Sequence, residues 1–258
     1  MGRFQGLTII VTGAAGGFGR RAAERFAAEG ARLVLSDLEV GPLEEVADSL
    51  GTESAVLAGD IANESHSESL VKLAVTRFGK LDIALNNAGI AQSFLKLPDL
   101  PSEEARRIID VDLLGIFYAL KHQIPVMERQ YGASGRGGTI VNIASAAGLA
   151  GVARLSVYSA AKHGVIGLTR SAAAEYALKG IRVNAVCPSF AKTNMVRDFF
   201  RLAGKGQVEL AAELTRGGPM RRFAEIDEVV EVILFAADPR NSFMTGTTLS
   251  VDGGVTAV

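Results

Sequence analysis

Short apolar runs recur along the chain, and within each run the apolar residues are nearly continuous rather than alternating with polar ones. The runs predict strands at 7–11, 31–36, 54–59, 81–85, 138–144 and 181–186. A strand with one face in water alternates, whereas a strand of a parallel sheet is covered on both faces and stays apolar throughout. The pattern therefore predicts a parallel sheet between two layers of helices.

Segments with helical periodicity separate these runs, at 17–29, 42–50, 64–78, 103–130, 157–178 and 226–237. Strands that alternate with helices form right-handed crossovers and build a doubly wound α/β sheet. Glycines at 30, 79 and 180 follow three of these segments, where helices commonly end. The alternation is not divided by a linker, so we expect a single domain over residues 1–258.

The segment 190–222 interrupts the alternation and reads as one or two amphipathic helices. Ligands of a doubly wound sheet bind beyond the carboxyl ends of its strands, and the segment follows the strand 181–186. We expect a lid over the bound ligand. A packing excursion or a subunit contact is the alternative.

Composition excludes several classes of function. The chain has 258 residues, a formal net charge of −1, one cysteine and three histidines. A nearly neutral chain has no overall field that attracts nucleic acid or an anionic membrane. The single Cys187 allows no internal disulfide, and a Cys/His zinc site is disfavoured. Without a signal peptide or an apolar stretch of about 18 residues, we expect a cytoplasmic protein that holds no metal.

A glycine-rich turn joins the first predicted strand to the first predicted helix. In TGAAGGFG, residues 12–19, the spacing of Gly13, Gly17 and Gly19 is G-x-x-x-G-x-G, and Phe18 lies within it. Glycine lets the backbone approach a pyrophosphate, whose charge is favoured at the helix N-terminus. The turn lacks the G-K-[ST] ending of a nucleoside triphosphatase loop, so it indicates a dinucleotide site.

An acidic residue ends the second predicted strand. Asp37 lies 18 residues after Gly19, where a dinucleotide site holds a carboxylate against the adenosine ribose. That charge would repel a 2′-phosphate, and the next residue is Leu38 rather than an arginine. Arg20 and Arg21 are interpreted as surface charges. We therefore expect NAD rather than NADP; the alternative for Asp37 is a helix or loop cap.

Further motifs follow the later strands in order. GDI at 59–61 and NNAG at 86–89 follow the third and fourth strands, and IVNIAS ends the fifth on Ser145. Tyr158 and Lys162 come 13 and 17 residues later, on the next predicted helix. Together with the glycine turn and VDGG at 251–254, this ordered set resembles the classical short-chain dehydrogenase/reductase family over essentially the whole chain.

The resemblance implies a Rossmann-type sheet of about seven parallel strands and a homo-oligomer, usually a homotetramer. It implies that Tyr158 is the general acid/base, that Lys162 binds the nicotinamide ribose, and that Ser145 orients the substrate oxygen. It also implies adenine contacts at Asp60 and Ile61, a wall beside the adenosine ribose at Asn87, Ala88 and Gly89, and nicotinamide contacts at Ala191 and Thr193.

Elementary chemistry supports the tyrosine–lysine pair. A free tyrosine titrates near about 10 and is a poor base at neutral pH. The four-residue spacing puts Tyr158 and Lys162 on one helix face, where the ammonium lowers the pKa of the phenol. The alternative is a core helix whose phenol bonds to a carbonyl and whose lysine reaches solvent.

The chain departs from the family at Asp112 in DVDLLG, where an asparagine is common. That asparagine helps to hold a helix kink and a water in the proton path. An ionised aspartate accepts hydrogen bonds but donates none, so we expect retained activity with an altered pH dependence. A protonated Asp112 would instead mimic asparagine.

Two smaller departures lie near the segment 190–222. Ser189 replaces a usual glycine, so the loop beside the nicotinamide is expected to bend differently or move less. Arg197, Arg201 and Lys205 lie four residues apart and predict a solvated helix face. The alternative is a docking strip for the phosphate of an acyl carrier or coenzyme A.

Apolar residues expected around the mouth of the site are Phe94, Leu95, Leu149, Phe190, Met195, Phe199 and Phe200. They favour a hydrophobic secondary alcohol or its ketone, cyclic and steroid-like ones included, although they could equally pack in the core or at a subunit interface.

A 3-oxoacyl-thioester reductase is the second hypothesis, and Asp37 counts against it because that reaction usually uses NADPH. A nucleotide-binding scaffold without catalysis is the third, which the intact Ser145, Tyr158 and Lys162 disfavour.

Overall fold

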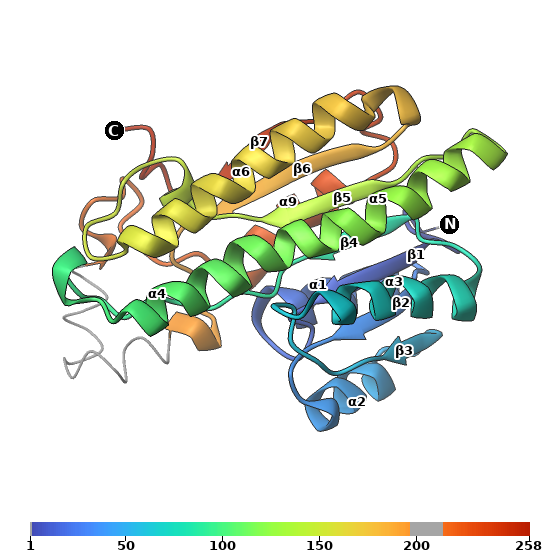
Figure 1. The fold of residues 1–258 in the computed structure, drawn as a ribbon, viewed down its shortest axis with the longest axis horizontal. Helices are drawn as coiled ribbons and strands as arrows, with labels where there is room; N and C mark the ends of the chain where they lie inside the picture. Colours follow the sequence, from blue (N-terminus) through green and yellow to red (C-terminus); the bar gives the residue numbers. More distant parts are fainter. Residues whose placement is uncertain (1, 197–213) are drawn as a thin grey trace.

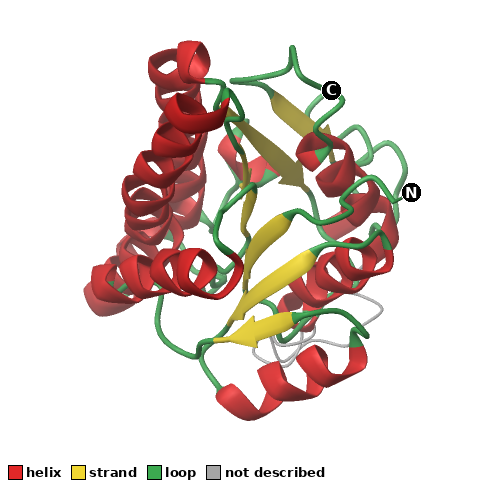
Figure 2. Cartoon of the chain, turned by 90° about the vertical axis from the view of Figure 1, so that its right-hand side faces the viewer, coloured by secondary structure: helices red, strands yellow, loops and turns green. Residues whose placement is uncertain are grey.

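Seven parallel strands form one sheet with helices on both faces, in a computed structural model that describes residues 2–196 and 214–258 (Figures 1 and 2). The strands are β1 (Thr8–Thr12), β2 (Arg32–Ser36), β3 (Ser54–Val56), β4 (Ile83–Asn86), β5 (Thr139–Ile143), β6 (Arg182–Pro188) and β7 (Thr248–Val251). Their order, β3-β2-β1-β4-β5-β6-β7, reverses between β1 and β4. Ligands of such sheets bind beyond the carboxyl ends of the strands at this reversal. The predicted doubly wound fold is confirmed.

The helices cover the sheet in two layers that pack into separate apolar cores. Within the described residues the α-helices are α1 (Gly17–Ala28), α2 (Val40–Ser49), α3 (Glu64–Phe78), α4 (Ser102–Ile109), α5 (Gly115–Ser134), α6 (Ser156–Tyr176) and α9 (Ile226–Ala237). One core joins α1, α2 and α9 to the sheet, and the other joins α3, α5 and α6. Within the described ranges, the helices are too short or too polar to cross a membrane.

The two edge strands differ most from the hydrophobic pattern. β3 ends at Val56, earlier than predicted, because it pairs with β2 alone and each of its residues is partly exposed. β7 matches none of the apolar runs, since its one exposed position, Ser250, breaks a short strand that is otherwise partly buried. The resemblance implied this strand, and the hydrophobic pattern missed it.

The segment predicted as a helix, 103–130, is helical throughout, but the hydrophobic pattern did not show a change of helix type within it. A turn of π-helix, Asp110–Leu114, separates α4 from α5, and the N–H of Gly115 donates to the carbonyl of Asp110 five residues back. The extra residue rotates Asp112 into the interior, where its side chain is fully buried. Such insertions are frequent at functional sites.

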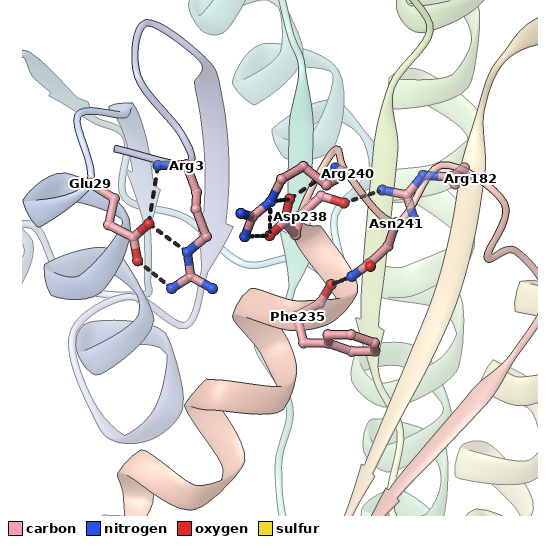
Figure 3. A network of polar contacts seen from close by, with 7 residues as sticks. All are labelled: Arg3, Glu29, Arg182, Phe235, Asp238, Arg240 and Asn241. Carbon is pink, nitrogen blue, oxygen red and sulfur yellow. Dashed lines mark hydrogen bonds and ion pairs between the residues drawn. The ribbon is translucent and has the colours of Figure 1, made fainter. Parts of the chain in front are cut away.

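Polar side chains hold the C-terminal end of α9 to the amino ends of the strands (Figure 3). Asp238 accepts hydrogen bonds from the backbone and guanidinium of Arg240, and its own carbonyl accepts one from Arg182 at 3.0 Å. Beside them the guanidinium of Arg3 pairs with Glu29, with 2.6 Å between Nε and Oε2. These contacts stabilise the packing of the helices on the sheet at the amino ends of the strands, opposite their carboxyl ends.

Candidate active site

The glycine-rich turn closes tightly between β1 and α1. Gly13 and Gly17 have φ values of 66° and 52°, a region that side chains other than glycine rarely adopt. A Cβ on Gly19 would lie 2.0 Å from the carbonyl oxygen of Gly13, so this position requires glycine for close packing. The N-cap of α1, Gly16, offers no side chain to the first N–H groups of the helix. They remain available for an anion such as a pyrophosphate.

Asp37 supports this turn as well as facing the cavity beyond it. Its Oδ2 accepts a hydrogen bond from Ala15 N–H at 2.9 Å, and its Oδ1 accepts one from Leu38 N–H at 2.8 Å. A carboxylate has about four acceptor positions, so positions remain for ribose hydroxyls. The loop-cap and the ribose-binding interpretations of Asp37 are therefore compatible.

Arg20 and Arg21 are engaged elsewhere, as expected for surface charges. The Nε of Arg20 lies 3.3 Å from Glu24, and the Nε of Arg21 lies 2.6 Å from Asp227. Neither arginine lines the cavity that Asp37 faces.

The third and fourth strands deliver their motifs to the same cavity. Asp60 pairs with Arg107 of α4 at 2.8 Å. Burial alone would raise the pKa of Asp60, but hydrogen bonds from Ala62 N–H and Arg107 outweigh it and hold the pKa below its usual value. In the NNAG motif, the hydroxyl of Thr12 accepts from the N–H groups of Asn87 (3.0 Å) and of the next residue. These bonds fix the motif against the end of β1.

Ser145, Tyr158 and Lys162 meet at the other end of the cavity. Ser145 lies two residues after the end of β5, and its hydroxyl donates to the carbonyl of Pro188 at 3.4 Å and accepts from Ala147 N–H at 3.1 Å. The Nζ of Lys162 lies 5.5 Å from the centre of the Tyr158 ring and donates to the carbonyl of Ile143 at 3.2 Å. The four-residue spacing thus places both side chains on one face of α6.

Burial is the largest influence on Tyr158, and it raises the pKa of the phenol. Lys162 lowers that pKa as expected, but the carboxylate of Asp112 raises it, and the pKa in this chain lies above its usual value. Burial also raises the pKa of the neighbouring Cys187 thiol to about 11, so the thiol is neutral near pH 7 and adds no charge to the site.

Asp112 lies behind Lys162 rather than in the cavity. Its Oδ1 accepts a hydrogen bond from Ile90 N–H at 2.9 Å and lies 3.7 Å from the Nζ of Lys162. Its Oδ2 is buried without a hydrogen-bond partner among the described residues. Burial raises the pKa of Asp112, with Lys162 opposing the shift. A Cβ on Gly89 would lie 2.6 Å from Oδ1, so the glycine of NNAG leaves room for this carboxyl.

Comparison with known proteins identifies the family of the chain. The sequence profile of the family described as "Enoyl-(Acyl carrier protein) reductase" matches residues 13–256, which is most of the chain. The chain belongs to the short-chain dehydrogenase/reductase family. Enzymes of this family are oxidoreductases that use nicotinamide cofactors.

Individual members of the family match over nearly their whole length. Cyclohexanol dehydrogenase of Acinetobacter sp. (strain SE19) is 36% identical over 258 residues, covering 99% of this chain and 97% of that protein. The crystal structure of levodione reductase superposes with a TM-score of 0.93 at 32% identity and covers 99% of both chains. The 3-ketoacyl-(acyl-carrier-protein) reductase from Brucella melitensis, complexed with NADH, has a TM-score of 0.88 at 32% identity, covering 98% of this chain and 99% of that one.

The residues expected from the family resemblance gather around one cavity of about 680 Å³. Expected nucleotide residues that line it are Gly13, Gly17, Phe18, Asp37, Asp60, Ile61, Asn87, Ala88, Gly89, Ala191 and Thr193. Ser145, Tyr158 and Lys162 line it too, whereas Gly19 and Asp112 do not. The residues present therefore fit a nicotinamide dinucleotide, with the tight glycine turn and Asp37 at one end and Tyr158 at the other.

The expected substrate residues divide into three groups. Phe190 and Met195 line the cavity. Phe94 and Leu149 are not among the described lining residues: Phe94 lies 5.2 Å below the guanidinium of Arg154, and Leu149 packs against the core under α6. Phe199 lies outside the described residues. So do Phe200, the basic positions 197, 201 and 205, and most of the expected lid over 190–222.

Sequence reasoning missed several residues of the cavity wall. Arg107, Gln92, and Val255, Thr256 and Val258 near the C-terminus all line it. None belongs to a motif, and a lone polar residue in a loop or a short C-terminal stretch carries no pattern that points to a site. They reach the cavity only because the chain folds back on itself.

Proposed function

We propose that this chain is an NAD-dependent enzyme that interconverts a hydrophobic, cyclic secondary alcohol and its ketone, with Tyr158 as the general acid/base. The observation that carries the proposal is that Ser145, Tyr158 and Lys162 line the same cavity as the glycine turn and Asp37. Two hydroxyl-bearing side chains that line one cavity suit a single substrate oxygen that bonds to both. Lys162 supplies the positive charge that such a phenol needs in order to ionise.

Each residue has a defined part in the reaction. A nicotinamide held in this cavity would supply the hydride-transfer chemistry in either direction. The oxygen of Tyr158 takes the proton from the alcohol, or returns it to the ketone oxygen. The hydroxyl of Ser145 orients the substrate oxygen, and the ammonium of Lys162 stabilises the phenolate. The same side chains serve both directions.

Charge at the nucleotide end supports NAD over NADP. Asp37 would face a 2′-phosphate, and Arg20 and Arg21 are bonded to carboxylates away from the cavity. Among the described lining residues the charged side chains are Asp37, Asp60, Arg107 and Lys162, and Arg107 is paired with Asp60. The similarity to a reductase that was crystallised with NADH agrees with this choice.

The substrate end is uncharged apart from Lys162. Apolar described residues near Tyr158 are Ile90, Ala147, Val152, Leu155, Phe190 and Met195. Such a wall favours a substrate without a charged group, and the related cyclohexanol dehydrogenase is named for a cyclic alcohol. A cytoplasmic location and a homotetramer belong to the same proposal. The large, highly exposed side chains of Leu178 and Phe243 are available for subunit contacts.

A 3-oxoacyl-thioester reductase is the second candidate, favoured by the match to the Brucella melitensis reductase. Asp37 argues against it wherever NADPH is the reductant. A catalytically inactive, nucleotide-binding scaffold is a weaker third candidate, because the three reactive side chains are intact and assembled.

Turnover of a panel of cyclic and linear alcohols and ketones, with NAD and NADP in parallel, tests the proposal. We expect NAD-dependent oxidation of cyclic alcohols, and a loss of about 10²-fold or more in kcat for Tyr158→Phe. Binding of NADH, followed by its fluorescence, is expected to survive in this variant. Tyr176→Phe, at the far end of the same helix, is the matched control and should retain activity.

Three results would count against the proposal. A clear preference for NADPH with acyl thioesters would favour the second candidate. Tight NAD binding without turnover of any alcohol or ketone would favour the scaffold. Full activity of Tyr158→Phe would remove Tyr158 from the reaction.

A further inference from the structure

The helix that carries Tyr158 begins without a cap of its own. Its N-cap residue, Leu155, has no polar side chain, and α6 starts at Ser156. The N–H groups of Val157 and Tyr158 therefore lie in the first turn, where a helix provides no internal acceptor. A capping side chain normally accepts from these second and third positions.

Gln92, from the loop after β4, supplies the missing acceptor from 66 residues earlier in the chain. Its Oε1 accepts from Val157 N–H at 3.0 Å and from Tyr158 N–H at 2.9 Å. Its Nε2 donates to the carbonyl of Arg154 at 3.1 Å. Two backbone N–H groups face one end of the Gln92 amide and a carbonyl faces the other, so the oxygen of the amide must lie at the end that faces Val157 and Tyr158. The side chain is 2% exposed, so these bonds are shielded from water.

The bond to Arg154 holds an unusual backbone conformation. Arg154 has a φ of 67°, a left-handed conformation that costs a residue with a Cβ about 1 kcal/mol or more. It lies two residues before α6 begins, so it sets the direction from which the chain enters the helix. Gln92 thus contacts both the entry to α6 and its first turn.

Gln92 is itself held on both sides by α4 and the π-turn that follows it. The N–H of Ile90 donates to Asp112 at 2.9 Å, and the N–H of Ser93 donates to Glu104 at 2.6 Å. The loop between these two anchors has little freedom to shift. The side chain of Gln92 therefore holds the first turn of α6 in one position relative to this loop.

We propose that Gln92 is a positioning residue for the reaction: a remote N-cap that sets the place of Tyr158 relative to Ser145 and the substrate oxygen. This inference rests on the proposed function. The first turn of α6 carries the phenol, while Lys162 one turn later is held separately by Ile143 and Asp112. Loss of the cap would therefore move Tyr158 more than Lys162. A displacement of about 1 Å in a reacting group can cost about 10²-fold in rate.

The test compares Gln92→Leu and Gln92→Glu with the matched variant Gln130→Leu. Gln130 also joins its side chain to backbone, accepting from Leu81 N–H and donating to Leu81 C=O, both at 2.8 Å, but at the amino end of β4. Gln130→Leu thus removes a similar bridge far from Tyr158. Steady-state kinetics with the best alcohol of the panel, thermal unfolding, and amide hydrogen exchange of peptides covering residues 155–160 are measured for all four proteins.

We expect Gln92→Leu to lower kcat by about tenfold or more, to leave the KM values for NAD and alcohol within about twofold, and to speed exchange at Val157 and Tyr158. Gln92→Glu keeps an acceptor for both N–H groups, so it should restore slow exchange and part of kcat. Gln130→Leu should lower the melting temperature without lowering kcat.

Several outcomes would overturn the proposal. An unchanged kcat for Gln92→Leu with reduced stability would make the residue a structural cap alone. A rise in the KM for the alcohol at constant kcat would mean direct contact with the substrate. Unchanged exchange at Val157 and Tyr158 would remove the capping role. If the wild-type chain turned over no substrate, the proposed function would fail, while the exchange measurement would still decide whether Gln92 caps α6.

Discussion

Asp112 determines the charge behind the reactive pair. An ionised Asp112 raises the pKa of Tyr158 and offsets the ammonium of Lys162, which alone would lower it. A protonated Asp112 would leave the ammonium unopposed. The unpartnered Oδ2 and the buried position favour the protonated form, whereas Lys162 at 3.7 Å favours the ionised one. An asparagine at this position would hold no charge in either state.

Replacing Asp112 by Asn is expected to shift the pH dependence of alcohol oxidation. Oxidation needs deprotonated Tyr158, and removal of a negative charge lowers the pKa of the phenol. The rising limb of kcat/KM against pH should therefore move to lower pH, by on the order of one unit. Activity at the optimum should be retained. The measurement is the pH profile of NADH formation at saturating NAD.

Asp110→Asn is the matched control, because Asp110 lies in the same π-turn but, among the described residues, Asp112 rather than Asp110 pairs with Lys162. Its profile should coincide with that of the wild type. If the profile of Asp112→Asn also stayed in place, Asp112 would have no part in the proton chemistry.

The turn between β1 and α1 shows how one element depends on a contact between two glycines. Gly19 is already inside α1, yet its missing side chain is what lets the carbonyl of Gly13 pack against the helix. Asn87 closes the turn from β4, with its amide 2.9 Å from the carbonyl of Thr12. The geometry of the phosphate-binding turn therefore depends on the helix, the preceding strand and its neighbour.

Gly19→Ala is expected to weaken NAD binding by about tenfold or more, because the added Cβ must push the carbonyl of Gly13 away and widen the turn. Titration of NADH by fluorescence measures the effect. Gly41→Ala, in the first turn of α2 with no heavy atom within 4 Å of the added Cβ, is the control. It should leave NADH binding unchanged, since alanine also favours helix. Wild-type affinity for NADH in Gly19→Ala would contradict this view of the turn.

At the scale of the whole molecule, the candidate active site and a stabilising ionic network lie at opposite ends of the strands. The cavity lies at the carboxyl ends of the strands, and the ionic network of Figure 3 lies at their amino ends. The side-chain hydrogen bond from Arg3 is the largest cause that lowers the pKa of Glu29, and the one from Arg240 similarly lowers the pKa of Asp238. A carboxyl with a lowered pKa stabilises the fold above its unfolded pKa, and this stabilisation is lost as pH falls through the folded value.

Glu29→Gln should therefore destabilise the protein near neutral pH and have little effect in acid. We expect a loss of about 1 kcal/mol, or about 2–4 °C in melting temperature, at pH 7. The difference should shrink as pH falls below the unfolded pKa of glutamate, about 4.3, and disappear only below the lowered pKa of folded Glu29. Thermal unfolding by circular dichroism at pH 7 and below 4 measures it.

Glu68→Gln, on the exposed face of α3, is the control, and kcat of Glu29→Gln should be unchanged. An equal loss at both pH values would show that the ion pair is not the cause.

Much of the fold could be predicted from the sequence because its causes are local. Continuous apolar runs, helical periodicity and the alternation of the two determine a parallel, doubly wound sheet. The four-residue spacing of Tyr158 and Lys162 places them on one helix face whatever surrounds them. The glycine turn, Asp37 and Ser145 lie at the ends of predicted strands, so their convergence at one edge of the sheet follows from the topology.

Only the tertiary structure decided what depends on contacts between distant segments. The hydrophobic pattern does not show β7, which pairs with β6, or the π-turn that buries Asp112 within the helix predicted over 103–130. The raised pKa of Tyr158 results from burial and from Asp112, neither of which the spacing of the motif contains. Gln92 caps α6 across 66 residues of chain. Patterns along the chain record which faces are buried, whereas hydrogen bonds and electrostatic interactions depend on which atoms the folded chain brings within a few ångströms.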